Sequence, residues 1–262
     1  MKYGFIGCGN MGGAIARALS RATKDIMVSD RSGKAREFAR ELGIGYGDNA
    51  AVAARCDRIF IAVKPHVVPQ VLAPLQEILA ARKPLLITMA AGLEIARLEE
   101  LAGTALPVVR IMPNTPTAIG KGVIPYCCSP LVTEQMLTDW LEDMRFCGLT
   151  DPLEERLMDA ASALSGSGPA LMYLLIEALA DGAVACGIPR AKALQYAAMT
   201  MAGSAEMVLS THRHPGELKD AVCSPGGSTI VGVQTLENHG FRGAAMDCVI
   251  NTCRRNKEMG KL

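Results

Sequence analysis

The chain has 262 residues, half of them apolar, with 27 lysines and arginines against 26 aspartates and glutamates. The apolar half is enough for a sizeable core, and the near-zero net charge, without a basic block, argues against nucleic acid as a partner. Because Met1 and Lys2 lead directly into an apolar strand pattern and the longer apolar stretches are broken by charge or glycine, we expect no signal peptide, no membrane span and a cytoplasmic protein.

The first predicted strand, Tyr3–Ile6, runs straight into a glycine-rich turn and a predicted helix over residues 13–20; the turn reads Gly7-Cys8-Gly9-Asn10-Met11-Gly12. In such a turn the first glycine allows the tight bend, the second lets the backbone approach a pyrophosphate, and the third lets helix pack on strand. The helix N-terminus then presents free N–H groups to the anion. The pattern predicts dinucleotide binding, against the alternative of an ordinary glycine-rich turn.

The second predicted strand, Ile26–Ser29, ends in Asp30-Arg31-Ser32. An acid at this place accepts hydrogen bonds from the ribose hydroxyls of NAD, whereas Arg and Ser bind the 2′-phosphate of NADP. The turn contains both, and Arg31 with Ser32 can form a phosphate site if the carboxylate is turned aside. We favour NADP(H), and NAD(H) stays possible.

Short apolar runs continue to alternate with helical patterns up to about residue 150. Strands are predicted at 44–46, 58–63, 85–89, 108–111 and 123–127, and helices at 33–42, 49–55, 67–80, 94–102 and 133–146. This alternation predicts an α/β fold with a doubly wound parallel sheet, covered on both faces, in a domain over residues 1–150. Parallel strands end at one edge of such a sheet, where ligands bind.

Small or stiff segments follow three of these strands. The fourth predicted strand ends in Ala62-Val63-Lys64-Pro65, which we expect to direct its backbone groups and Lys64 toward the cofactor edge of the sheet. The alternative is a simple turn that enters a helix. Met89-Ala90-Ala91-Gly92 permits close contact with a flat ring. In Met112-Pro113-Asn114-Thr115-Pro116 two prolines fix an Asn-Thr pair, so Asn114 is a candidate to orient nicotinamide.

From Asp151 onward the pattern is helical, which predicts a second, all-α domain over residues 151–262. Helices are predicted at 154–164, 169–186, 190–210, 227–238 and 243–258. The helix Pro169–Cys186 is apolar on nearly every face apart from Glu177 and Asp181, so it should be buried all round. A domain of this size cannot bury all the apolar surface of such a helix, so we expect a helical dimer interface. A membrane span is the rival interpretation.

Two glycine and serine clusters interrupt the helical half, at Ser165-Gly166-Ser167-Gly168-Pro169 and at Cys223-Ser224-Pro225-Gly226-Gly227-Ser228-Thr229. Each is predicted to be a loop that exposes N–H groups and hydroxyls at a helix N-terminus. Such a loop could bind a carboxylate, and the alternative is a simple capping loop.

Neither the cysteines nor the histidines form a metal-binding pattern. The nine cysteines include no Cys-x-x-Cys pair and are typical of small buried side chains in a reducing compartment. His212 and His214 are flanked by Thr211, Arg213 and Pro215, which favours a solvated turn. No metal site is predicted.

Together, the segments GFIGCGNMG, AVKP, AAG, MPNTP, SGSGPA and HPGELKDAVCSPGGSTI, in this order over essentially the whole chain, resemble the pyrroline-5-carboxylate reductase family. The resemblance implies an N-terminal Rossmann domain, a C-terminal helical domain that dimerises, and reduction of L-1-pyrroline-5-carboxylate to L-proline by NAD(P)H, the final step of proline biosynthesis. The implied partners are this small-molecule substrate and a second copy of the chain.

The resemblance also implies two sets of contact residues. Cofactor contacts fall on Ile6, Gly7, Cys8, Gly9, Asn10, Met11, the turn Ser29–Ser32, Asn49, Ala62, Val63, Lys64, Pro65, Met89, Ala90 and Ala91, beside Gly12 and Asn114 from the motifs. Substrate contacts fall on Glu155, Ser165, Gly166, Ser167, Ser224, Gly226, Gly227, Ser228 and Thr229.

The chemistry is hydride transfer to the carbon of a cyclic C=N bond, which protonation of the nitrogen makes more electrophilic. We expect the N–H groups of Gly226–Thr229 to bind the carboxylate, and the Thr229 hydroxyl to accept a hydrogen bond from the ring N–H. Such an imine is already substantially protonated near neutral pH, so Thr229 would orient rather than ionise. His66 is a rival proton donor, although a surface histidine at a helix start is the simpler interpretation.

Two other functions are compatible with a dinucleotide-binding half joined to a helical half. A β-hydroxyacid dehydrogenase uses a lysine on a long helix, but Lys192 and Lys219 do not lie in the glycine-rich setting of those enzymes. A non-catalytic dinucleotide sensor would bind cofactor without turnover.

Overall fold

The computed structural model describes residues 1–259, and it divides into two compact units. Unit 1 contains Met1–Ser167 together with the chain from Thr252 onward, and unit 2 contains Gly168–Asn251. The packing boundary therefore lies after Ser167 rather than at residue 150. The reason is that the segment following residue 150 still forms a strand and helical turns that pack on the sheet. The domains 1–150 and 151–262 stay a prediction about the functional division of the chain.

Unit 1 is built on an eight-stranded sheet in the order β3-β2-β1-β4-β5-β6-β7-β8. The strands are β1 (Tyr3–Ile6), β2 (Ile26–Ser29), β3 (Gly45–Tyr46), β4 (Arg58–Ile61), β5 (Leu85–Thr88), β6 (Val108–Ile111), β7 (Gly122–Cys128) and β8 (Gly148–Pro152). The order of the strands across the sheet reverses between β1 and β4, which lie side by side in parallel register with Ile6 opposite Ile61. This is the switch point of a doubly wound fold, where ligands bind at the carboxyl ends of the strands.

The sheet has the predicted doubly wound, mainly parallel arrangement, and it departs from parallel at one position, because β7 runs antiparallel to β6. The connection holds only a short 3₁₀ turn, Thr115–Ile119. A parallel return needs a crossover of about a dozen residues or more, so this connection can only reverse the chain. The edge strand β8 was not predicted, since Gly148, Asp151 and Pro152 are poor strand formers.

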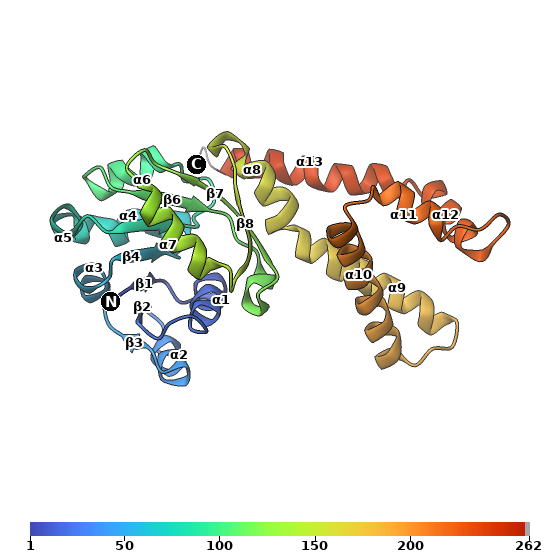
Figure 1. Ribbon diagram of the computed structural model, residues 1–262, viewed down its shortest axis with the longest axis horizontal. Coiled ribbons are helices and arrows are strands. Elements are labelled where there is room, and N and C mark those ends of the chain that lie inside the picture. The colour runs from blue at the N-terminus through green and yellow to red at the C-terminus, as the bar shows by residue number, and fades with distance from the viewer. Residues whose placement is uncertain (260–262) are drawn as a thin grey trace. The chain divides into compact units, whose positions relative to one another are not determined.

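Helices cover both faces of this sheet (Figure 1). They are α1 (Asn10–Leu19), α2 (Lys34–Leu42), α3 (Asn49–Arg55), α4 (Val68–Leu72), α5 (Gln76–Arg82), α6 (Ile95–Ala102), α7 (Glu134–Met144) and α8 (Met158–Ala161). The helix expected over 67–80 is divided into α4 and α5 by a 3₁₀ turn at Ala73–Leu75 that contains Pro74. Proline cannot donate the helical hydrogen bond at its position.

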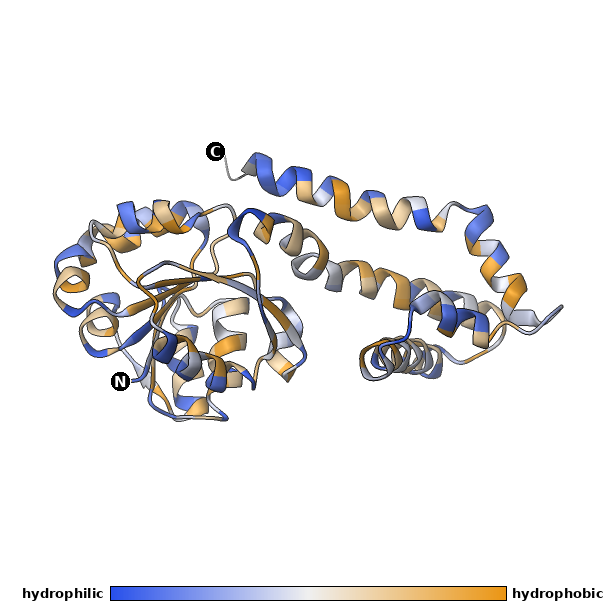
Figure 2. Ribbon diagram, turned by 45° about the horizontal axis from the view of Figure 1, so that its top comes forward, coloured by the Kyte–Doolittle hydropathy of each residue, from blue (hydrophilic) through white to orange (hydrophobic). Residues whose placement is uncertain are grey.

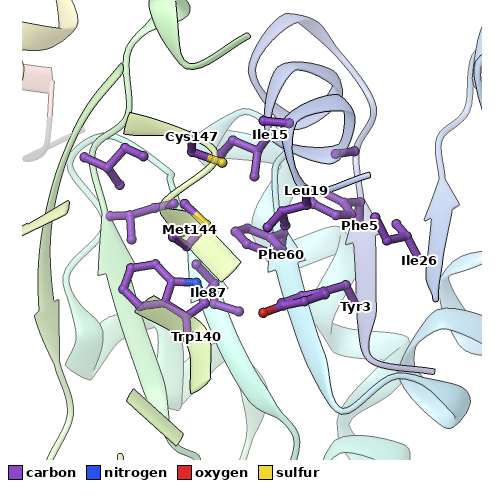
Figure 3. Close-up of a cluster of buried hydrophobic side chains, with 14 of the residues drawn as sticks. Tyr3, Phe5, Ile15, Leu19, Ile26, Phe60, Ile87, Trp140, Met144 and Cys147 are labelled. Carbon is purple, nitrogen blue, oxygen red and sulfur yellow. The ribbon is translucent and has the colours of Figure 1, made fainter. Parts of the chain in front are cut away.

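The core beneath α1 and α7 is packed around aromatic rings of the central strands (Figure 3). Phe5 and Phe60, on neighbouring strands, stack with ring centroids 4.4 Å apart. Tyr3 packs beside Phe60, and its hydroxyl donates a hydrogen bond of 2.7 Å to Asp143 of α7. This core fixes β1 and therefore the turn that follows it.

Unit 2 is helical and consists of α9 (Gly168–Ala185), α10 (Arg190–Thr211), α11 (Pro215–Ala221), α12 (Ser228–Asn238) and the larger part of α13 (Phe241–Met259). Helix α9 packs against α10. The short helix α11 was not predicted; Pro215 occupies its first turn, and the His214 ring accepts a hydrogen bond from the N–H of Gly216.

The expectation that the helix Pro169–Cys186 is buried all round is wrong for the single chain. Within the described residues, Ala180 is the one buried position of α9, while Tyr173 and Leu174 are 60% and 65% exposed. Hydrophobic residues recur along the helices of this unit (Figure 2), and many of them are exposed, among them Leu179, Met199 and Leu209. The stretch Glu155–Ala185 is long and apolar enough to cross a membrane by length and composition alone. Apolar surface on this scale indicates a partner for these helices.

Candidate active site

The geometry of the first turn requires glycine at two of its three glycine positions and leaves the third open. Gly7 has φ +103°, and a Cβ there would lie 2.6 Å from the carbonyl oxygen of Ala62. A Cβ on Gly12 would lie 2.3 Å from the carbonyl oxygen of Gly7, so only glycine lets α1 approach the turn this closely. By contrast, no described atom lies within 4 Å of a Cβ built on Gly9, which faces open space. The turn is thus tight on its inner side and accessible on its outer side.

A cavity of about 740 Å³ opens beside this turn, at the carboxyl ends of the parallel strands. It is lined by many of the predicted cofactor contacts: Ile6, Gly7, Gly9, Asn10, Met11, Ser29, Asp30, Arg31, Asn49, Ala62, Val63, Lys64, Pro65, Met89 and Ala91. Helix α1 begins at this cavity with Gly9 as its N-cap, and no side chain among residues 1–259 caps it. Its first N–H groups are therefore available to an anion.

Five predicted cofactor residues do not line the cavity, because each is either buried or hydrogen-bonded to other residues of unit 1. Gly12 is buried against Gly7, and Ala90 is buried beneath the turn after β5. Cys8 and Ser32 bind the Asp30 carboxylate through their N–H groups. Asn114 is 6% exposed, and its amide binds the backbone elsewhere in unit 1.

The cavity also has lining residues that the sequence analysis missed. Met112 and Pro113 follow β6 directly, and their place at a strand end was an available signal. Val67, Gln70 and Val71 come from the turn and helix after Pro65, and no motif indicated them.

The Asp30 carboxylate is held by backbone on both sides. One oxygen accepts a hydrogen bond of 2.7 Å from the N–H of Cys8, and the other accepts one of 2.7 Å from the N–H of Ser32. Desolvation raises the pKa of Asp30, but the backbone hydrogen bonds from Cys8 and Ser32 and the charge of Arg31 outweigh it, so the pKa lies below its ordinary value. Asp30 therefore clamps the glycine turn to the turn after β2.

Replacing Asp30 with asparagine should lower Tm at neutral pH, because one of the two N–H groups loses its acceptor. A lost hydrogen bond of this kind costs about 1 kcal/mol, or roughly 2–4 °C in a protein of this size. A depressed pKa means that the stabilisation is present above the unfolded pKa, about 3.9, and is lost as pH falls through the folded pKa. The Tm difference between wild type and Asp30→Asn should thus be constant near neutrality and shrink in acid; a difference independent of pH would contradict this role.

Neighbouring polar residues have simpler surroundings. Asn49, at the start of α3, accepts a hydrogen bond of 2.6 Å from the Ser29 hydroxyl, which fixes it at the cavity wall. Lys64 lines the cavity and is exposed, whereas His66 is exposed in the following 3₁₀ turn.

The substrate residues expected between 155 and 167 lie in helical turns of unit 1. A single oxygen of Glu155 accepts hydrogen bonds from the N–H of Ile95, at 2.8 Å, and from the buried Arg110, at 3.0 Å. These bonds join α6 and β6 to the turn that contains Glu155, so its carboxylate is already partnered. Ser165 and Gly166 end a π-helical turn, Ser162–Gly166, and the N–H of Ser167 closes that turn on the Ser162 carbonyl.

The later loop lies in unit 2 and precedes α12. Gly226 has φ +70°, and the N–H of Gly227 donates a hydrogen bond of 3.0 Å to the Ser224 carbonyl. Ser224, Gly226, Ser228 and Thr229 are exposed, and no side chain of the described residues caps α12. The first N–H groups of α12 and the Thr229 hydroxyl thus form an accessible, uncharged donor set.

Comparison with known proteins decides the family. The chain is 37% identical to the pyrroline-5-carboxylate reductase of Escherichia coli over 266 residues, covering 99% of this chain and 98% of that protein. It is 40% identical to the Glycine max enzyme of the same name over 262 residues, covering 98% and 95%. The chain belongs to the pyrroline-5-carboxylate reductase family.

Two family models and one solved structure agree with this membership. The pyrroline-5-carboxylate reductase dimerisation model matches residues 155–259, and a model named NADP oxidoreductase, coenzyme F420-dependent, matches residues 2–92. The Plasmodium falciparum pyrroline carboxylate reductase, solved with NADP bound, superposes with a TM-score of 0.90 at 35% identity, covering 99% of this chain and 98% of that one. The helices α9 to α13, with their exposed apolar residues, fall within the part of the chain that the dimerisation model matches.

Proposed function

We propose that the chain reduces L-1-pyrroline-5-carboxylate to L-proline, the last step of proline biosynthesis, by hydride transfer from a reduced nicotinamide dinucleotide. The observation that carries the proposal is the cavity at the β1–β4 switch point, with an open Gly9 and an uncapped α1 beside it. Together these features fit a pyrophosphate.

The residues facing the cavity fit such a cofactor along its length. Gly9, Asn10 and Met11 would hold the pyrophosphate through backbone N–H groups, and Asn49 lines the wall at the start of α3. Met89, Ala91, Met112 and Pro113 supply an apolar end that suits a flat ring. The cofactor, when bound, supplies the hydride.

The substrate is a five-membered cyclic imine that bears a carboxylate. We assign the carboxylate to the N–H groups of Gly226–Thr229 and the ring N–H to the Thr229 hydroxyl oxygen, which accepts its hydrogen bond. The ring carbon of the C=N bond gains the hydride, the C=N electron pair moves to nitrogen, and the nitrogen keeps the proton it carried in the iminium form. The task of Thr229 is orientation, so no ionisation of a side chain is needed.

Within the cavity, the clamped Asp30 supports a preference for NADP(H). Both oxygens of Asp30 accept hydrogen bonds from backbone N–H groups, so neither is directed at a ribose. Arg31 is exposed at the cavity edge and is the charged side chain that can bind a 2′-phosphate. We therefore assign NADPH as the preferred reductant, with NADH as the weaker alternative.

Replacing Arg31 with glutamine should raise KM for NADPH about tenfold, the size of one charge-assisted contact, and leave KM for NADH within about twofold. Arg40→Gln, on the exposed face of α2, is the matched control and should change neither value. Equal effects on both cofactors would show that Arg31 does not contact the 2′-phosphate.

The direct test of the function is loss of reduced-nicotinamide absorbance when purified protein is mixed with pyrroline-5-carboxylate and NADPH or NADH. Turnover with NADPH above NADH supports the whole proposal. Cofactor binding with no turnover would instead indicate a dinucleotide sensor. The active form as a homodimer and its location in the cytoplasm stay predictions.

A further inference from the structure

Asn114 is a buried polar residue that the proposed mechanism does not use. It follows Met112 and Pro113, which line the cavity, but its own side chain is 6% exposed and turned into unit 1. Its Oδ1 accepts a hydrogen bond of 2.9 Å from the N–H of Val123, and its Nδ2 donates one of 3.0 Å to the Ser165 carbonyl. Because one partner is a donor and the other an acceptor, the amide satisfies both at once, which a carboxylate cannot do.

The sequence after Ser165 removes one backbone donor that its carbonyl would have in a regular α-helix. In a helix, the carbonyl of residue 165 accepts from the N–H of residue 169. Residue 169 is proline, which has no N–H. The turn there is also π-helical, a geometry often found at functional sites. The Asn114 amide therefore supplies the donor that Pro169 lacks.

We propose that Asn114 is a positioning residue, which ties the ring end of the cofactor cavity, at Met112 and Pro113, to the turn Ser165–Ser167. The proposal rests on the proposed function, because Ser165, Gly166 and Ser167 are substrate contacts only by resemblance. It assigns Asn114 a role through Ser165, in place of the direct nicotinamide contact expected from the sequence.

The isosteric variant Asn114→Asp isolates the bond to Ser165. A carboxylate still accepts from the Val123 N–H, but toward the Ser165 carbonyl it presents an oxygen in place of a donor. We expect kcat/KM for pyrroline-5-carboxylate to fall about tenfold or more, and the Kd of NADPH, from its fluorescence, to stay within about twofold. Asn256→Asp is the matched control, since the Asn256 Nδ2 also donates to a backbone carbonyl of this helical segment, that of Asp159, at 3.1 Å. It should leave kcat/KM within about twofold.

A double variant separates positioning from mere stability. In Asn114→Asp with Pro169→Ala, residue 169 gains an N–H that can satisfy the Ser165 carbonyl within the helix. Tm should recover toward the wild-type value while kcat/KM stays low, because the connection to β6 is still missing. Recovery of activity together with Tm would overturn the proposal, as would an Asn114→Asp enzyme with normal kcat/KM or with NADPH affinity reduced in the same proportion.

Hydrogen exchange gives a readout that does not depend on turnover. Peptides that cover residues 162–170 should exchange faster in Asn114→Asp than in wild type, whereas peptides that cover the glycine turn should not change. Asn114→Ser serves for the same measurement if the charged variant does not fold. Wild-type protein without turnover would refute the proposed function, and unchanged exchange at residues 162–170 would refute the connection itself.

Discussion

Replacing Gly12 with valine should weaken NADPH binding by at least about 100-fold. A Cβ at this position would lie 2.3 Å from the Gly7 carbonyl oxygen and 2.8 Å from the Ala62 Cβ, and neither atom belongs to a flexible side-chain end. Helix α1 must therefore move away from the turn, which displaces the N–H groups that face the pyrophosphate. A fluorescence titration of NADPH measures the loss.

The next residue provides the control for this experiment. A Cβ on Gly13 would meet the Cys8 carbonyl oxygen at 3.6 Å, an ordinary contact, so Gly13→Ala should bind NADPH within about threefold of wild type. Gly12→Ala is the milder variant if valine prevents folding, which circular dichroism would reveal. Tight binding by a folded Gly12→Val protein would show that the dinucleotide does not lie on this turn.

Replacing Thr229 with alanine should lower kcat/KM for pyrroline-5-carboxylate by about 100-fold, the scale of one positioned polar group at a reacting centre. The hydroxyl is exposed at the start of α12, among N–H groups that could receive a carboxylate. Because Thr229 lies in unit 2 and the cavity in unit 1, the Kd of NADPH should stay within about twofold. Steady-state kinetics and the NADPH titration measure the two effects separately.

Two variants show whether this effect belongs to the hydroxyl. Thr229→Ser keeps the oxygen and should recover most of the activity. Thr235→Ala removes a hydroxyl that bonds within α12, to the Val231 carbonyl, and should leave kcat/KM nearly unchanged. Near-normal turnover by Thr229→Ala would remove Thr229 from the mechanism.

The parts of the fold that could be predicted are those with a local cause. The strands Tyr3–Ile6, Ile26–Ser29 and Val108–Ile111 occur with the predicted bounds, because each is a short, mostly apolar run next to a residue that interrupts it. Two glycines of the turn were predictable for the same reason, because a Cβ on Gly7 or Gly12 would clash with nearby backbone or with Ala62, which follows β4.

The features that were missed depend on contacts distant in the sequence. Glu155 bonds to Ile95 and Arg110, and Asn114 bonds to Ser165; no local pattern shows that these polar groups are already partnered. Strand β7 reverses direction because the connection between β6 and β7 is short. In the sequence, this connection resembles a loop that leads into a helix. The exposed surface of α9 was misjudged for a different reason, because a sequence pattern does not show which apolar residues find partners within one chain.

Transfer of one hydride from NADPH to the C=N carbon of pyrroline-5-carboxylate is the step on which the other predictions depend. The most direct measurement uses NADPH that carries deuterium at the transferable C4 position, with pyrroline-5-carboxylate, in ordinary water, followed by mass and NMR analysis of the product. We expect L-proline with a single deuterium at the ring carbon that belonged to the C=N bond. Proline without deuterium, or no proline at all from protein that binds both ligands, would contradict it.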